Sequence, residues 1–288
     1  MIDPRELGND EELLYHYTSA DALLGMLGSP SRRAEIWMTQ IQYMNDKVEW
    51  WEAYDMLNQH RRRMASNPSE ELRRLAEHMG NGELSAFGRT FVFSLSSERD
   101  LLSQWRGYAP TGGYCIGFKK KHLRQIARKE RFHFVRCMYE EQEKEASIAH
   151  LLDALRQDIA NKYVDPRFAE IKDADPVLVT AWVKYQHGFN ARATYFKHAS
   201  FREERETRLV GDVPAGGGDG RARWRTRGNM VIPYCAIDIE PKDDFQPISE
   251  VIVGPGADYR LAHHAVQFLM MDRHREVEIR PSSSTLRF

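Results

Sequence analysis

The order of strand-like and helix-like segments constrains the fold of this chain more than any other feature. Short apolar runs of strand length, bounded by glycine, proline or polar residues, occur in the first half and again in the last third. Between them lie two long segments with helical periodicity. Strands and helices that occur in groups, without regular alternation, predict an α+β fold.

The two helical segments fall between about residues 140 and 196. Residues 140–163 carry an apolar stripe at helical spacing, made of Ile148, Leu151, Leu152, Leu155 and Ile159. Residues 176–196 carry a second apolar stripe, which contains more aromatic residues. We expect residues 1–288 to form a single domain, with residues 140–196 as a helical insertion within it.

Composition places the chain among folded proteins, with 42% hydrophobic and 29% charged residues in 288. The three cysteines are far apart and form no CxxC pair, which predicts a reducing compartment without a disulfide framework or a zinc site. The acidic N-terminus lacks the apolar core of a signal peptide, and no run approaches the roughly 18 apolar residues of a membrane span. We therefore expect a cytoplasmic protein that does not enter a membrane.

The net charge of −1 gives no general affinity for nucleic acid. A local basic segment leaves that partner open, because four arginines alternate with other residues around Trp224: Arg221, Arg223, Arg225 and Arg227. The fingerprints GxSxG, HExxH and GxxxxGK[ST] are absent from the sequence, which leaves hydrolase, zinc-protease and P-loop interpretations without support.

The first block with chemical potential is Tyr15-His16-Tyr17-Thr18-Ser19, at the end of an expected strand. Alternation along a strand sends His16 to one face and its two tyrosine neighbours to the other. A histidine followed by hydroxyl residues can hydrogen-bond a sugar diol or an amide. The alternative is a histidine satisfied by a neighbouring carbonyl, with the hydroxyl residues capping the next helix.

The second block is the strand Phe93-Ser94-Leu95-Ser96 with the short helix that follows it. Trp105 and Tyr108 lie three residues apart and share a helix face. Such a pair can form one wall of a slot for a flat ring. The alternative is that both rings belong to the core.

The third block is the charged run of residues 201–210. On a strand, Glu204, Glu206 and Arg208 would face the same way. These carboxylates could serve a site, or Arg205 and Arg208 could bracket them as ion pairs at a solvated surface.

Together the blocks resemble a widespread bacterial family of unknown function, over about residues 13–270. The resemblance rests on the His-Tyr-Thr start, the Asn45-Asp46 corner with Glu49 nearby, the Trp-x-x-Tyr helix and the Glu-x-Glu-x-Arg strand.

A second resemblance is to ADP-ribosyltransferases of the His-Tyr-Glu type, which implies a split β-sheet core with flanking helices. In that family His16 would hold the adenosine-side ribose, Tyr108 would stack on nicotinamide, and Glu206 or Glu204 would bond the nicotinamide ribose. Tyr17 stands where glycine is common, and the Glu-x-Glu pair is more typical of the arginine-modifying branch. The residues that this resemblance assigns to NAD binding are His16, Tyr17, Thr18, Ser94, Trp105, Tyr108, Glu204 and Arg208.

The implied activity is that of an ADP-ribosyltransferase or NAD glycohydrolase that uses NAD as its substrate and needs no metal. The acceptor would be protein, nucleic acid or water. Bacterial enzymes of this kind act as toxins or in defence against phage, so the resemblance implies those settings too. The alternatives are a non-catalytic module that binds a nucleotide or a partner protein, and a nucleic-acid binder that uses residues 221–227.

Overall fold

The chain divides into two compact units. A computed structural model describes residues 11–27, 33–44, 48–66, 70, 73, 90–110, 112–172, 175–213, 221–242, 244–272 and 276–284. The sheet unit comprises Met1–Gln40, Thr90–Cys137 and Phe201–Phe288, and the helical unit comprises Ile41–Arg89 and Met138–Ser200. The Asn45-Asp46 corner and the side chain of Glu49 lie outside the described residues.

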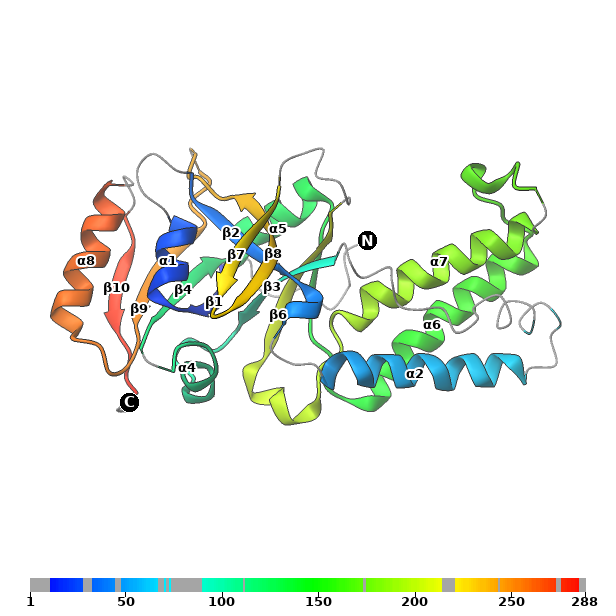
Figure 1. Cartoon of the computed structure of the whole chain (residues 1–288), viewed down its shortest axis with the longest axis horizontal. Coiled ribbons are helices and arrows are strands. Elements are labelled where there is room, and N and C mark those ends of the chain that lie inside the picture. Colours follow the sequence, from blue (N-terminus) through cyan, green and yellow to red (C-terminus); the bar gives the residue numbers. More distant parts are fainter. Residues whose placement is uncertain are drawn as a thin grey trace. The chain divides into compact units, whose positions relative to one another are not determined.

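The sheet unit is built on one mixed sheet (Figure 1). Its described strands follow the order β10-β9-β4-β1-β3-β2-β8-β7, and β6 lies between β3 and β5. Neighbours are antiparallel, except that β10 runs parallel to β9. The strands are β1 (Leu13–Thr18), β2 (Glu35–Gln40), β3 (Thr90–Ser96), β4 (Tyr114–Lys119), β5 (His133–Arg136), β6 (Glu206–Asp212), β7 (Ala222–Arg227), β8 (Met230–Asp238), β9 (Ile248–Val253) and β10 (Glu278–Pro281).

The sheet is split along one edge of β3. The other edge of β3 pairs with β6 from Thr90 to Ser96. On the split edge, Phe91 and Val92 pair with β2, whereas Ser96 pairs with Tyr15 of β1. The two ladders do not meet, so the polar backbone groups of residues 93–95 on this edge need partners other than a strand.

One face of the sheet carries the main apolar core. Phe91, Phe93 and Leu95 of β3 belong to it. Three helices cover it with buried side chains: α1 (Ala20–Leu27), α5 (Lys120–Glu130) and α8 (Tyr259–Asp272). The opposite face carries the alternate residues of β3, among them Ser94 and Ser96, and a smaller cluster around Trp105 of α4 (Leu102–Tyr108).

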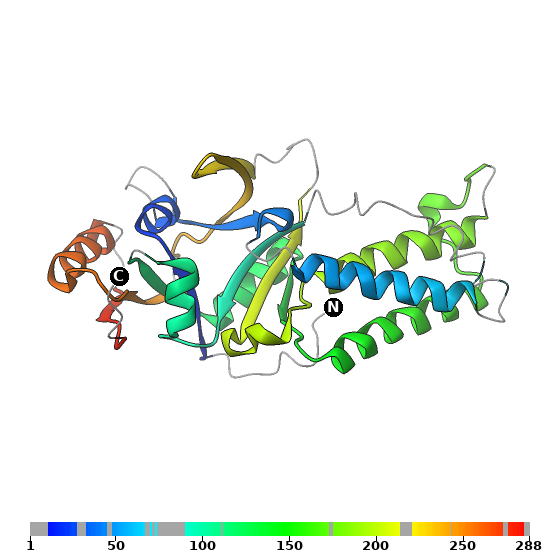
Figure 2. The same cartoon turned by 60° about the horizontal axis from the view of Figure 1, so that its bottom comes forward.

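The helical unit contains three long helices, α2 (Val48–Ala65), α6 (Glu141–Ala160) and α7 (Pro176–Ala193), which run alongside one another (Figures 1 and 2). The short 3₁₀ segments η2 (Ile41–Tyr43) and η4 (Pro166–Phe168) belong to the same unit. The apolar stripe that the sequence predicts on residues 140–163 is buried, from Ile148 to Ile159. Asp175 caps α7, because its Oδ1 accepts from the backbone N–H of Val177 at 2.9 Å.

The α+β class expected from the order of segments is confirmed. The helices expected within residues 140–196 are present, and the structure groups them with residues 41–89 in the helical unit. Two elements were not predicted, α5 and β7. Basic residues dominate both segments. In α5 the apolar residues Leu123, Ile126 and Ala127 nevertheless recur at helical spacing, so this helix carried a signal that could have found it. Among the described residues, no helix combines the length and apolar character needed to cross a bilayer.

Candidate functional site

A pocket opens in the sheet unit at the split of β3. It encloses about 300 Å³, part of which is open solvent. Its lining comes from β1, β3, α4, the end of the 3₁₀ segment η5 (Ala199–Glu204) and the start of β6. The lining residues are Tyr15, His16, Tyr17, Ser94, Leu95, Ser96, Gln104, Tyr108, Glu204 and Glu206.

His16 reaches into the split. Its Nδ1 lies 2.9 Å from the carbonyl oxygen of Ser94, and its ring stacks on Phe93 with centroids 4.3 Å apart. Since a carbonyl only accepts, Nδ1 carries the proton and Nε2 is left as an acceptor. Burial lowers the pKa of His16 to about 4, against the opposing hydrogen bond to Ser94, and the positive charge of Arg225 acts in the same direction as burial. The imidazole is therefore neutral at neutral pH.

Glu206 begins β6 and is held by Arg208. Nε of Arg208 donates to Oε1 of Glu206 at 2.7 Å and Nη2 donates to Oε2 at 3.0 Å, and both side chains are buried. Ser96 lies opposite Glu206 and Ser94 lies opposite Arg208, so these four residues share one face of the sheet. The bidentate pair fixes the orientation of the carboxylate at the pocket.

Glu204 reaches the same pocket by a different route. The strand begins only at Glu206, and Glu204 ends the 3₁₀ segment η5 (Ala199–Glu204). The chain turns at Arg205, whose φ of 42° lies in the left-handed region. Arg205 pairs with Glu98 at 2.8 Å and does not bracket the two glutamates. The expectation that Glu204 and Glu206 lie on one continuous strand is wrong, because the strand begins only at Glu206.

The helix α4 presents Gln104 and Tyr108 to the pocket, one turn apart. Trp105, which the sequence placed beside Tyr108 in the slot, is fully buried and absent from the lining. Its Nε1 donates to Oδ1 of Asp100 at 2.6 Å, and its ring meets Tyr17 edge-on at 4.8 Å. The core alternative therefore applies to Trp105, because its indole N–H has a partner inside the fold.

Tyr17 positions α4 from β1. Its hydroxyl donates to the carbonyl of Glu98 and accepts from the backbone N–H of Leu101, both at 2.8 Å. Burial raises the pKa of Tyr17. These bonds hold the segment that leads into α4 and so place Gln104 and Tyr108.

Of two other predicted site residues, Thr18 and Ser94, only Ser94 lines the pocket. Thr18 is buried, pairs with Tyr114 through the backbone and does not line the pocket, which corrects its expected contact with NAD. Ser94 does line the pocket, and its Oγ is buried without a hydrogen-bond partner in the described part of the chain. A buried hydroxyl without a partner is costly, and at a pocket wall it points to a ligand group.

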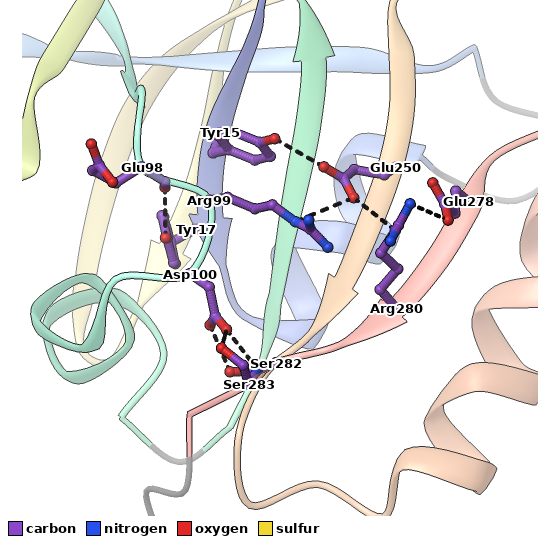
Figure 3. A network of polar contacts seen from close by, with 10 residues as sticks. All are labelled: Tyr15, Tyr17, Glu98, Arg99, Asp100, Glu250, Glu278, Arg280, Ser282 and Ser283. Carbon is purple, nitrogen blue, oxygen red and sulfur yellow. Dashed lines mark hydrogen bonds and ion pairs between the residues drawn. The ribbon is translucent and has the colours of Figure 1, made fainter.

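A polar network supports the wall beyond Tyr15 (Figure 3). The Tyr15 hydroxyl donates to Oε1 of the buried Glu250 at 2.9 Å. Arg99 and Arg280 approach the other oxygen of Glu250, at 3.5 and 3.6 Å. The network fixes the Tyr15 ring through its hydroxyl.

Asp100 fastens the segment before α4 to the end of the chain (Figure 3). It accepts hydrogen bonds from Ser282, Ser283 and Trp105, at 2.6 Å each. Burial alone would raise the pKa of Asp100, but these bonds outweigh it and lower the pKa. Asp100 is thus a structural anchor for the helix that carries Gln104 and Tyr108.

Sequence reasoning missed Gln104 as a pocket residue. Its spacing of four from Tyr108 is the helical signal that could have found it, since residues four apart share a face as those three apart do. Tyr15, Leu95 and Ser96 lie within the quoted blocks but were not singled out. Among the described residues, no group of histidine, cysteine, aspartate and glutamate is arranged to hold a metal ion.

Comparison with known proteins gives one match. Residues 104–209 match a family model described as "Protein of unknown function (DUF2971)". The matched segment runs from α4 into β6, so it contains Tyr108 and Glu206 together with α6 and α7. No curated protein and no solved structure matches the chain.

Proposed function

We propose that the pocket binds the nicotinamide–ribose end of NAD and that the protein transfers the ADP-ribose group of NAD to an acceptor or to water. The observation that supports this most is convergence: His16, Tyr108 and Glu206, which lie far apart in the sequence, line one pocket. Each had been assigned a role toward NAD by resemblance alone.

The polar groups of the pocket suit that ligand. The neutral His16 ring offers Nε2 as an acceptor for a ribose hydroxyl, and the Ser94 hydroxyl offers a second partner. Gln104 has both a donor and an acceptor, as the nicotinamide carboxamide does. The Tyr108 ring would lie against the flat nicotinamide.

The reaction needs a carboxylate at the ribose. As the bond between nicotinamide nitrogen and ribose C1 breaks, its electron pair leaves with nicotinamide and C1 becomes oxocarbenium-like. Glu206, fixed by Arg208, would stabilise the developing positive charge. The acceptor then forms a bond to C1 and loses a proton. With water as the acceptor, the products are nicotinamide, ADP-ribose and a proton.

The test is the release of nicotinamide from NAD by purified protein. Glu206→Gln keeps the size of the side chain and a hydrogen-bonding group toward Arg208 but removes the charge. We expect its turnover to fall on the order of 10²–10³-fold. Glu203→Gln is the matched control, because Glu203 is exposed on the 3₁₀ segment η5 that precedes β6, and we expect wild-type turnover from it.

The non-catalytic alternative has a distinct signature. A binding module would bind NAD without releasing nicotinamide, and Glu206→Gln would then alter affinity alone. Turnover equal to wild type in Glu206→Gln would remove the proposed role of this carboxylate.

A further inference from the structure

Arg225 of β7 is a partly buried cation that contacts a hydroxyl and two aromatic rings. Its Nη2 donates to Oγ1 of Thr39 at 2.8 Å, and its guanidinium lies over the rings of Trp37 and Tyr234, 5.4 and 5.9 Å from their centroids. In the part of the chain that the structure describes, no aspartate or glutamate pairs with it. Arg223, on the same strand, does pair with Glu35 at 2.8 Å.

The charge of Arg225 is partly buried. Burial lowers the pKa of Arg225, and the neighbouring charge of Arg227 lowers it further. A guanidinium remains charged in proteins, so the fold retains this cation at a cost. Contact with aromatic rings offsets part of that cost. An anion bound between the two arginines would offset the rest.

Arg225 lies on the pocket face of the sheet. Arg223 is paired with Tyr234, Tyr234 with Thr39, and Thr39 with Val92, so alternation places Arg225 and Ser94 on one face. Thr39 is one strand away from β3 and is paired two residues before Ser94. With about 3.3 Å per residue and about 4.8 Å between strands, the backbone of Thr39, to whose hydroxyl Arg225 donates, lies roughly 8 Å from the backbone of Ser94. The positive charge of Arg225 also acts to lower the pKa of His16, which lines the pocket.

The chemistry of a dinucleotide requires a second subsite. A nicotinamide riboside bound in the pocket would continue outward through its negatively charged 5′-phosphate. Arg225 reaches Thr39 on the same face of the sheet as Ser94 of the pocket lining.

We infer that Arg225 and Arg227 form a phosphate-binding subsite for the pyrophosphate of a dinucleotide whose nicotinamide end lies in the pocket. This inference rests on the proposed function. It identifies the substrate class as pyrophosphate-linked dinucleotides and excludes uncharged nucleosides as good substrates.

The first experiment needs no turnover. Binding of inorganic pyrophosphate and of ADP-ribose is measured by calorimetry for wild type, Arg225→Gln, Arg225→Lys and Arg223→Gln. We expect Arg225→Gln to weaken both about 10- to 100-fold, as loss of a charged hydrogen bond does. Arg225→Lys should recover part of the affinity, and Arg223→Gln should bind like wild type because its charge is already neutralised by Glu35. Equal binding by wild type and Arg225→Gln overturns the subsite, whether or not the protein cleaves NAD.

The second experiment compares substrates. Arg225→Gln should raise the KM for NAD about 10- to 100-fold with little change in kcat, and should leave turnover of nicotinamide riboside unchanged. Equal impairment with both substrates means that the variant damages the pocket itself, and it overturns the assignment to phosphate. If no variant cleaves either substrate while pyrophosphate binding still depends on Arg225, the proposed function fails and the anion subsite stands.

Discussion

The two units of the chain bury their polar side chains in different ways. In the helical unit, two buried threonine hydroxyls bond back to their own helix: Thr180 donates to the carbonyl of Pro176 at 2.7 Å, and Thr194 to that of Ala191 at 2.6 Å. In the sheet unit, buried polar groups from separate segments gather around one pocket, where Ser96, Gln104, Glu204 and Glu206 are all at most 9% exposed.

This difference separates structural from functional burial. A hydroxyl that hydrogen-bonds a carbonyl of its own helix needs no partner from another segment. A buried polar side chain that depends on distant segments costs free energy unless those segments hydrogen-bond it or a ligand does. The sheet unit contains the candidate site. The helical unit, in its described part, is an apolar core that also buries polar side chains, among them His60, Lys144 and Lys197.

The largest effect should come from breaking the buried Glu206–Arg208 pair. Arg208→Leu leaves the Glu206 carboxylate buried without its bidentate partner, and we expect the free energy of unfolding to fall by about 3–5 kcal/mol. The measurement is urea unfolding followed by circular dichroism. Adding Glu206→Gln to Arg208→Leu should recover part of the loss, because the unpaired charge is then gone.

The helical unit supplies the comparison for that pair. Lys184 and Asp158 are joined at 2.8 Å, but their side chains are 40% and 30% exposed. Lys184→Met should lower the free energy of unfolding by at most about 1 kcal/mol. Similar losses from Arg208→Leu and Lys184→Met would contradict the distinction between the two units.

The sequence predicted the periodicity of apolar helices well, but it predicted poorly which way individual side chains face. The stripe on α6 was predictable because five apolar residues at helical spacing have one stable arrangement, against a neighbouring helix. β7 was missed because Arg223, Arg225 and Arg227 alternate with Trp224 and Thr226, so neither face looks apolar. Its pairing with β8 shows that Trp224 and the three arginines lie on opposite faces, which weakens the interpretation of residues 221–227 as one stacking and basic surface for nucleic acid.

The site could be predicted as blocks but not as one pocket. His16, Tyr108 and Glu206 were each assigned to a site by resemblance to a known family, whereas each block taken alone also fitted a structural role. Their convergence depends on the pairing of β3 with both β1 and β6, which no local pattern encodes. The rotation of α4 was equally hidden: whether Trp105 or Gln104 faces the pocket depends on Asp100, which accepts the indole N–H.

A smaller effect should appear in the dependence of stability on pH. The pKa of His16 in the folded protein, about 4, lies below the ordinary histidine value of 6.5 because the ring is buried. The unfolded chain therefore binds the proton first, so the stability from His16 is complete above pH 6.5 and is lost as pH falls toward 4. The expected loss is on the order of 2–3 kcal/mol.

The check for His16 is a series of urea unfolding curves between pH 7 and pH 4. His16→Gln cannot take up the proton and should flatten the curve over this range. His133→Gln removes an exposed histidine of the same unit and should keep the wild-type slope. A slope in His16→Gln equal to that of wild type would mean that other groups cause the acid sensitivity.

The smallest and sharpest test uses two buried hydroxyls that lack partners in the described part of the chain, Ser94 in the sheet unit and Tyr185 in the helical unit. Removing an unsatisfied buried hydroxyl relieves its desolvation cost, so Ser94→Ala and Tyr185→Phe should each raise the free energy of unfolding by about 1 kcal/mol. Their effects on binding should differ. Ser94→Ala should weaken NAD binding, measured by calorimetry, because it removes a partner for the ribose, whereas Tyr185→Phe should leave NAD binding unchanged. Stabilisation by both variants with loss of affinity in Ser94→Ala alone would mean that one orphan hydroxyl is kept for a ligand and the other is only tolerated by its core.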